Sequence, residues 1–153
     1  MYSFLNWLQQ KVFLSKLLIL VGIGWCFCLI MTPVALANQT PTEIKISLGN
    51  STGELKFFPD HLQFKAGTPY KLVFDNPSPE KHYFTGKDFA DASWTKKVQA
   101  GKVEVKGAIH ELELKPEAEA EWFLTPMKAG KYEFHCSIPG HAEAGMTGAI
   151  IVE

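Results

Sequence analysis

The sequence is poor in cysteine and carries no excess of positive charge. Only three of its 153 residues are cysteines, and two of these, Cys26 and Cys28, lie close to the N-terminus. The formal net charge is −1, and because Lys11 and Lys16 both lie in the first 37 residues, the remainder of the chain is three units negative. A protein that binds the phosphates of nucleic acids needs a basic surface, so this charge argues against nucleic acid as a partner.

Residues 1–37 are typical of an export signal. Lys11 and Lys16 form a basic start, residues 17–31 are an unbroken apolar run, and a small-x-small triplet ends at Ala37. We expect a signal peptide that is cleaved after Ala37. An uncleaved membrane anchor is the alternative, although the apolar run is shorter than the roughly 20 residues that span a bilayer. The segment contains no arginine, which excludes the twin-arginine export signature.

Cleavage after Ala37 would leave residues 38–153 as one domain with one cysteine, Cys136. No disulfide could then form within this domain. Export would bring it to a periplasm or a thylakoid lumen, and an unpaired thiol is a liability in an oxidising compartment unless something occupies it. A role for Cys136 as a metal ligand or as a nucleophile therefore has to be considered.

Short segments of alternating polarity recur along residues 38–153. In residues 43–48, Ile44, Ile46 and Leu48 share one side, which is the period-2 pattern of a half-buried strand. Turn-forming Gly, Pro, Asn and Asp separate these segments. Further extended segments are expected at residues 55–58, 61–64, 70–74, 103–105, 109–114, 120–124, 131–136 and 148–152. Their number and spacing predict an all-β sandwich.

One segment departs from this pattern. Residues 87–100 predict a short helix that ends before Gly101, because glycine commonly follows the last helical residue. We also expect three large aromatic side chains, those of Trp94, Trp122 and Phe123, to lie in the core.

The residues around Cys136 carry the chemistry. In residues 131–136, alternation places Tyr132, Phe134 and Cys136 on one face, so Cys136 points inward. His141 and Met146 follow with Cys-x4-His-x4-Met spacing, on one loop between two strands. Two imidazoles, one thiolate and a weak axial thioether are the ligand set of copper sites that transfer electrons. The loop supplies only one of the two imidazoles.

The second imidazole is expected from a distant strand, and His82 is the candidate. It follows a proline-rich bend and has the same strand parity as Phe84, which places it on the inward face. His61 and His110 remain alternatives. His135 is disfavoured because neighbouring residues on a strand point to opposite faces, so it would point away from Cys136.

Three further residues bear on this site. Met127 is the less well placed substitute for Met146 as the thioether ligand. Asn76 and Ser137 are candidates to brace the loop by hydrogen bonds, as metal sites commonly require. The alternative for both is that they are ordinary turn residues.

The segment from Cys136 to Met146 resembles the copper loop of the cupredoxins, the family of plastocyanin, azurin, rusticyanin and the plant phytocyanins. In that family a histidine on an earlier strand precedes Cys, His and Met in this order, and His82, Cys136, His141 and Met146 match it. The Cys–His spacing is longer than in plastocyanin and nearer that of rusticyanin. The resemblance implies a Greek-key β-sandwich that holds one copper ion, cycling between Cu(I) and Cu(II), and carries electrons.

The expected function is therefore that of an exported, monomeric blue-copper protein that passes single electrons between redox proteins. These partners would dock transiently near His141, where Ile138, Pro139 and Ala142 form an apolar rim. The protein supplies every ligand and leaves no open position for a substrate, so we do not expect an enzyme. The membrane would be a partner only if the leader is retained.

Two other functions compete with electron transfer. A periplasmic copper-handling protein could use the same four ligands. A cysteine hydrolase would instead use Cys136 as the nucleophile and His141 as the base. A binuclear copper centre is disfavoured, because it would need a second cysteine in the loop.

Overall fold

The computed structural model describes residues 40–153. The signal segment predicted at residues 1–37, its alternative as a retained anchor, and the domain boundary at residue 38 lie outside the described residues and stay predictions. Within the described part, no helix is both long enough and apolar enough to cross a membrane.

Six strands form the first of two sheets. They are β1 (Thr42–Leu48), β2 (Phe57–Phe58), β4 (Tyr70–Asp75), β6 (Ser93–Ala100), β7 (Val103–Val105) and β9 (Glu119–Pro126). Their order in the sheet is β2-β1-β4-β9-β6-β7. The β1–β4 pair is parallel and every other pair in this sheet is antiparallel. Short strands β2 and β7 therefore form its two edges.

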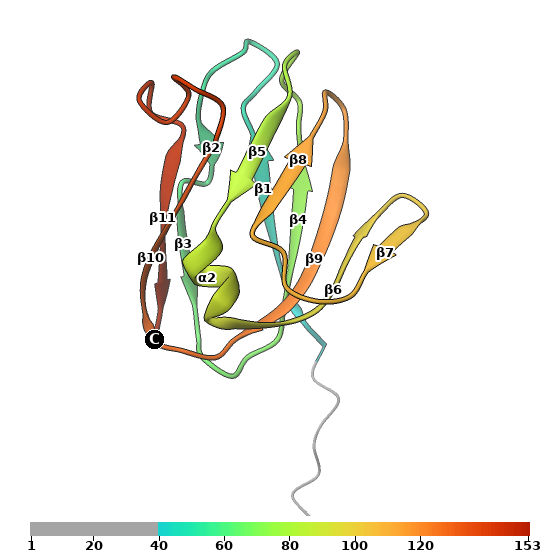
Figure 1. The fold of residues 1–153 in the computed structure, drawn as a ribbon, viewed down its shortest axis with the longest axis vertical. Helices are drawn as coiled ribbons and strands as arrows, with labels where there is room; N and C mark the ends of the chain where they lie inside the picture. Colours follow the sequence, from blue (N-terminus) through green and yellow to red (C-terminus); the bar gives the residue numbers. More distant parts are fainter. Residues whose placement is uncertain (1–39) are drawn as a thin grey trace, which may run out of the picture. The chain divides into compact units, whose positions relative to one another are not determined.

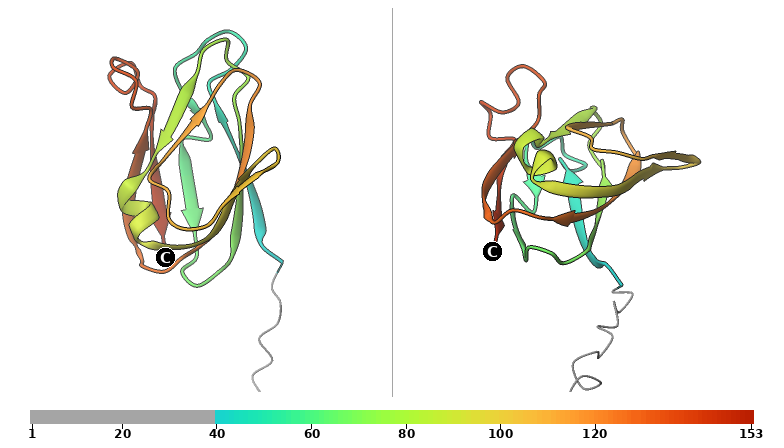
Figure 2. Two further views of the ribbon diagram at one scale, coloured as in Figure 1. Left: turned by 45° about the vertical axis from the view of Figure 1, so that its right-hand side comes forward. Right: turned by 60° about the horizontal axis from the view of Figure 1, so that its bottom comes forward.

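Five strands form the second sheet. They are β3 (His61–Phe64), β5 (His82–Thr85), β8 (Glu111–Leu114), β10 (Gly130–His135) and β11 (Thr147–Val152). Their order is β3-β11-β10-β5-β8, so the chain passes repeatedly from one sheet to the other. Figures 1 and 2 show the two sheets as the layers of a sandwich with Greek-key-like connections. The prediction of an all-β sandwich is confirmed.

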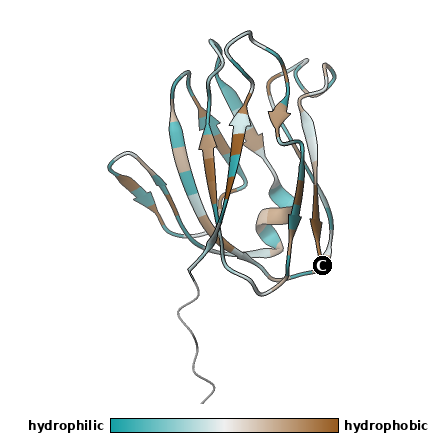
Figure 3. Cartoon of the chain, turned by 180° about the vertical axis from the view of Figure 1, so that it is seen from behind, coloured by the Kyte–Doolittle hydropathy of each residue, from teal (hydrophilic) through white to brown (hydrophobic). Residues whose placement is uncertain are grey.

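Aromatic side chains fill the space between the sheets. Hydrophobic and hydrophilic residues alternate along several strands (Figure 3). Because successive side chains point to opposite faces of a sheet, this alternation gives each sheet one apolar face. The rings of Phe84 on β5 and Phe134 on β10 stack with their centroids 4.9 Å apart, and Phe57 meets Phe134 edge-on at 4.9 Å. This contact holds β5 and β10 together in the core, and both strands lead to the candidate site.

The helix predicted over residues 87–100 is wrong in its extent. Helix α2 covers only Lys87–Asp91, and the chain then enters β6, which pairs with β9. Val98 lies opposite Trp122 in this pairing. Because β-branched and aromatic residues favour strands, and because β9 offers a backbone partner, the second half of the segment is extended. The local pattern alone did not reveal that partner.

The core prediction for the three large aromatic residues is correct only in part. Trp122 is fully buried, whereas Phe123 is half-buried and Trp94 is 58% exposed. Alternation along β9 explains Phe123, because neighbours on a strand point to opposite faces. Trp94 lies on the outer face of β6, opposite Thr125.

Candidate metal centre

The predicted site residues come from two strands and one loop at the same end of the sandwich. His82 is the first residue of β5, and Cys136 directly follows the last residue of β10. His141 and Met146 lie on the loop that joins β10 to β11. In Figure 1 this loop is at the opposite end from the C-terminus and from the start of β1. The fold therefore brings the four residues to one end.

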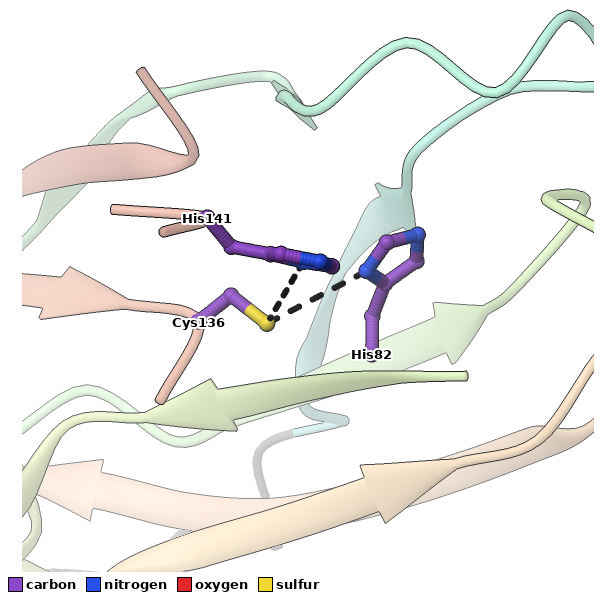
Figure 4. Close-up of side chains that lie close together, drawn as sticks. All are labelled: His82, Cys136 and His141. Carbon is purple, nitrogen blue, oxygen red and sulfur yellow. Dashed lines mark hydrogen bonds between the residues drawn. The ribbon is translucent and has the colours of Figure 1, made fainter. Parts of the chain in front are cut away.

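Three side chains converge on one point. The sulfur of Cys136 lies 3.5 Å from Nδ1 of His141 and 3.9 Å from Nδ1 of His82 (Figure 4). The donor atoms of the three residues all lie within 4.8 Å of one another. Nitrogen and sulfur atoms that bind one metal ion at about 2.0–2.3 Å stand roughly 3.5–4 Å apart. The donor atoms are thus spaced as ligands of a single ion would be.

Met146 is tied to the same site through its backbone. Its N–H donates to the carbonyl oxygen of His141 at 2.9 Å, and its own carbonyl accepts the N–H of Cys136 at 3.0 Å. The side chain of Met146 is completely buried, whereas Met127 is 59% exposed. The loop therefore folds back so that the backbone of Met146 lies beside those of Cys136 and His141, and its burial favours Met146 over Met127 as the thioether ligand.

Burial keeps the imidazole of His82 in the form that can bind a metal. His82 is completely buried, and its burial lowers the pKa of the imidazole, with the nearby His141 lowering it further. A neutral imidazole presents a lone pair to a metal ion. Nε2 of His82 is buried without a hydrogen-bond partner, while Nδ1 is the nitrogen directed at Cys136.

The sulfur of Cys136 also receives a hydrogen bond. The backbone N–H of Tyr83, the residue after His82, donates to Cys136 Sγ at 3.4 Å. A donated N–H stabilises negative charge on sulfur, and a thiolate is the form that binds metals. This bond also fixes the distance between β5 and the residue that follows β10.

Asn76 braces the bend that leads into β5. Its Nδ2 donates to the carbonyl oxygens of Glu80, at 2.8 Å, and Leu114, at 2.9 Å, and its Oδ1 accepts the N–H of Ser78. Asn76 is fully buried, so these bonds replace lost contacts with water. The bracing role predicted for Asn76 is therefore found, but it acts on the bend before His82 and not on the loop.

Ser137 does brace the loop, and its partner is a residue that the sequence did not reveal. Its hydroxyl donates to Oε2 of Glu111 at 2.7 Å, and Thr85 donates to the same oxygen at 2.8 Å. Glu111 thus joins three neighbouring elements, the edge strand β8, the strand β5 and the loop after Cys136. Charge-assisted hydrogen bonds of this kind are stronger than neutral ones.

We expect Glu111→Ala to loosen the loop while leaving the sandwich intact. Removing the carboxylate leaves two exposed hydroxyls to water, so the free energy of unfolding should fall by only about 1 kcal/mol. Amide hydrogen exchange at residues 137–146 should become faster. Glu119→Ala, on an exposed position of β9, is the matched control. Unchanged exchange in the loop of the Glu111 variant would show that the bond to Ser137 does not restrain it.

The other histidines lie apart from this cluster. Nδ1 of His61 is 2.8 Å from Oδ1 of Asp60, and Nε2 of His110 is 2.7 Å from Oδ1 of Asp91. His135 is exposed, on the face of β10 away from the core. The structure thus favours His82 over the alternatives, as strand parity predicts.

Comparisons with known proteins agree with this geometry. Residues 18–152 match the family described as the cupredoxin-like domain, so the chain belongs to the cupredoxin family. The donor set of the site is of the type 1 copper kind, and one copper ion is the cofactor that it fits.

Solved structures with a similar fold include two auracyanins. Auracyanin from Roseiflexus castenholzii is 19% identical, with a TM-score of 0.54, over 75% of this chain and 99% of its own. Auracyanin A from Chloroflexus aurantiacus, a blue copper protein, is 24% identical, with a TM-score of 0.53, over 74% of this chain and 100% of its own. Part of a multicopper oxidase from Pediococcus acidilactici, 28% of its chain, matches 79% of this one with 13% identity and a TM-score of 0.58. These likenesses concern the fold.

A shorter match is found among curated proteins. Over 34 residues the chain is 56% identical to the copper-resistant cuproprotein CopI of Rubrivivax gelatinosus. The match covers 22% of this chain and only 19% of that relative. It links a segment of the chain to a protein of copper resistance.

Proposed function

We propose that this protein is an exported electron carrier that holds one copper ion through His82, Cys136, His141 and Met146. The observation that carries the proposal is the convergence of one sulfur and two imidazole Nδ1 atoms at a site where the thioether residue is also fixed. When bound, copper would supply a one-electron redox change between Cu(I) and Cu(II). The donor atoms come from packed strands and a hydrogen-bonded loop, which limits rearrangement when the charge changes.

The proposed site has little room for catalysis. Four protein ligands would leave no open position for a substrate. Cys136 is only 1% exposed, which also argues against its use as the nucleophile of a hydrolase, since a substrate could not reach the sulfur. Electron transfer needs only an approach to the edge of the site.

His141 is the proposed exit for the electron. Its side chain is half-buried, whereas that of His82 is completely buried, so the imidazole of His141 is the one that reaches the surface. Around it, Ile138 and Ala142 are half-buried and Pro139 is exposed, which gives a small apolar rim. A patch of this kind suits weak, short-lived docking of redox proteins to a monomer.

Copper handling is the second candidate function, and the match to a segment of CopI favours it. The same four residues would then hold copper for delivery instead of for redox cycling. Either function would act outside the cytoplasm if residues 1–37 direct export. The two differ in how readily the protein gives up its copper.

Spectroscopy and voltammetry on the copper-loaded protein test the proposal. Adding Cu(II) should produce an intense orange-red absorption band from thiolate-to-copper charge transfer. An electron carrier should then show a reversible one-electron wave and retain copper in the presence of a chelator. Irreversible redox behaviour with rapid loss of Cu(I) to the chelator would favour copper handling. A colourless protein that binds no copper would contradict both functions.

A further inference from the structure

We propose that the chain has a second metal site, built from His61, Glu133 and His135 on the outer face of the five-stranded sheet. It would bind an exposed divalent transition-metal ion, with Cu(II) preferred over Zn(II). This site is separate from the buried centre and does not depend on the function proposed for it.

Strand register places the three residues on one face of the sheet, on either side of β11. Glu133 on β10 lies opposite Ala149 on β11, and Ala149 in turn lies opposite His61 on β3. Residues directly opposite one another project from the same face of a sheet, so Glu133 and His61 flank the small side chain of Ala149. His135 is two positions from Glu133 on the same strand, and therefore on the same face.

The surface is hollowed at this place. One open groove has Asp60, His61, Glu133 and His135 along it. The residues that line the rest of it are mostly small: Phe134, Ala142, Gly145, Thr147, Gly148 and Ala149. β3 and β10 lie roughly 10 Å apart with β11 between them. The small side chains of β11 at this place leave space for a hydrated ion.

Asp60 prepares His61 to act as a ligand. Its Oδ1 lies 2.8 Å from Nδ1 of His61, and this hydrogen bond lowers the pKa of the Asp60 carboxyl. The carboxylate is therefore ionised at neutral pH, and Nδ1–H of the imidazole donates to it. Nε2, on the other side of the ring, is the nitrogen left to bind a metal ion. A carboxylate behind a ligating histidine is a common feature of protein metal sites, because it fixes the tautomer and orients the ring.

The chemistry of the donors defines the ion. Two imidazoles and a carboxylate suit Cu(II) and Zn(II), and sites of this type bind Cu(II) more tightly than other first-row divalent ions. Without a thiolate or thioether the site has no preference for Cu(I). The buried site would thus offer sulfur donors as well as imidazoles, and the exposed site only nitrogen and oxygen donors. The two sites would lie on opposite faces of β10, because His135 and Cys136 are consecutive residues.

The exposed site should be much the weaker of the two. The side chain of His61 is 77% exposed. Among the described residues, only His82, Cys136 and His141 form a group of three whose donor atoms all lie within 4.8 Å of one another. The side chains of His61, Glu133 and His135 must therefore turn toward one another to bind an ion. Binding must order exposed side chains, which costs conformational entropy. We therefore expect the exposed site to fill only after the buried centre and to release its ion to a chelator first.

The test is a Cu(II) titration of the full chain after its buried centre has been loaded. A second equivalent should give an axial electron paramagnetic resonance signal with nitrogen couplings, distinct from that of the coloured centre. His61→Ala and His135→Ala should each weaken the second binding step at least about tenfold, and Asp60→Asn should weaken it about tenfold by releasing the ring of His61. The coloured band reports separately that each variant is folded.

His110→Ala is the matched control, because it removes an exposed histidine that is also paired with a carboxylate but lies outside the groove. The second step should survive this change. It should also survive Cys136→Ser, so the test remains valid if the buried centre does not hold copper. The proposal is overturned if no second step occurs, or if the step persists in the double variant of His61 and His135.

Discussion

Replacing Cys136 with serine is expected to abolish the orange-red absorption of the copper-loaded protein. The sulfur of Cys136 lies 3.5 Å from Nδ1 of His141 and 3.9 Å from Nδ1 of His82, and the band arises from charge transfer between thiolate and copper. A serine hydroxyl stays protonated at neutral pH and is a hard donor, so it replaces neither the charge nor the softness of the thiolate. Copper affinity should fall with the colour.

A neighbouring substitution controls for the position in the chain. His135→Ala changes the residue directly before Cys136, but its side chain is exposed on the opposite face of β10, so the coloured band should remain. Visible absorption measures the band in both variants, and equilibrium dialysis with one equivalent of Cu(II) measures the copper affinity of the Cys136→Ser protein. A band of undiminished intensity in the Cys136→Ser protein would show that the sulfur is not a ligand, and the central proposal would fail.

The ligand positions were predictable because they depend on local patterns. Alternation along 131–136 places Cys136 inward, and the same parity argument places His82 beside Phe84 on the buried face; both side chains are buried in the structure. Strand parity needs no knowledge of the partner strand, so it survives folding unchanged. That His82 would meet the loop was predicted from the ligands that a copper site needs, and not from any local pattern in the sequence.

Contacts between distant segments were not predictable in this way. Ser137 and Glu111 are 26 residues apart, and nothing near Glu111 marks it as the acceptor that holds the loop. The helix prediction was wrong for the second half of residues 87–100 for a similar reason, because pairing with β9 holds β6 in an extended conformation. The groove with His61 and His135 likewise depends on β3 lying beside β11, which only the assembled sheet shows.

Gly148→Ala is expected to destabilise the protein more than the same change at any other glycine in residues 40–153. Gly148 on β11 lies opposite Phe134 on β10, and the ring of Phe134 lies across it. A Cβ atom at Gly148 would stand 2.1 Å from Cζ of Phe134 and 2.6 Å from the backbone oxygen of Asp60. The ring cannot move freely, because it is stacked on Phe84 and met edge-on by Phe57.

Relieving this overlap requires movement of packed side chains or of backbone. Overpacking of this kind typically costs about 1–3 kcal/mol. Because the overlap includes a backbone atom, we expect Gly148→Ala to lower the free energy of unfolding by about 3 kcal/mol. The midpoint of thermal unfolding should fall by roughly 10 °C. Circular dichroism of the metal-free chain in urea and on heating measures both quantities.

Gly86→Ala is the matched control, since a Cβ there would meet Phe84 at 3.4 Å and Phe134 at 3.6 Å, which are ordinary contacts. It should cost no more than about 1 kcal/mol. Because Phe134 packs on Phe84, a displaced ring disturbs the two strands that carry His82 and Cys136, so Gly148→Ala should also broaden the copper absorption band. Wild-type stability in Gly148→Ala would mean that the ring of Phe134 has room that the packed structure does not show.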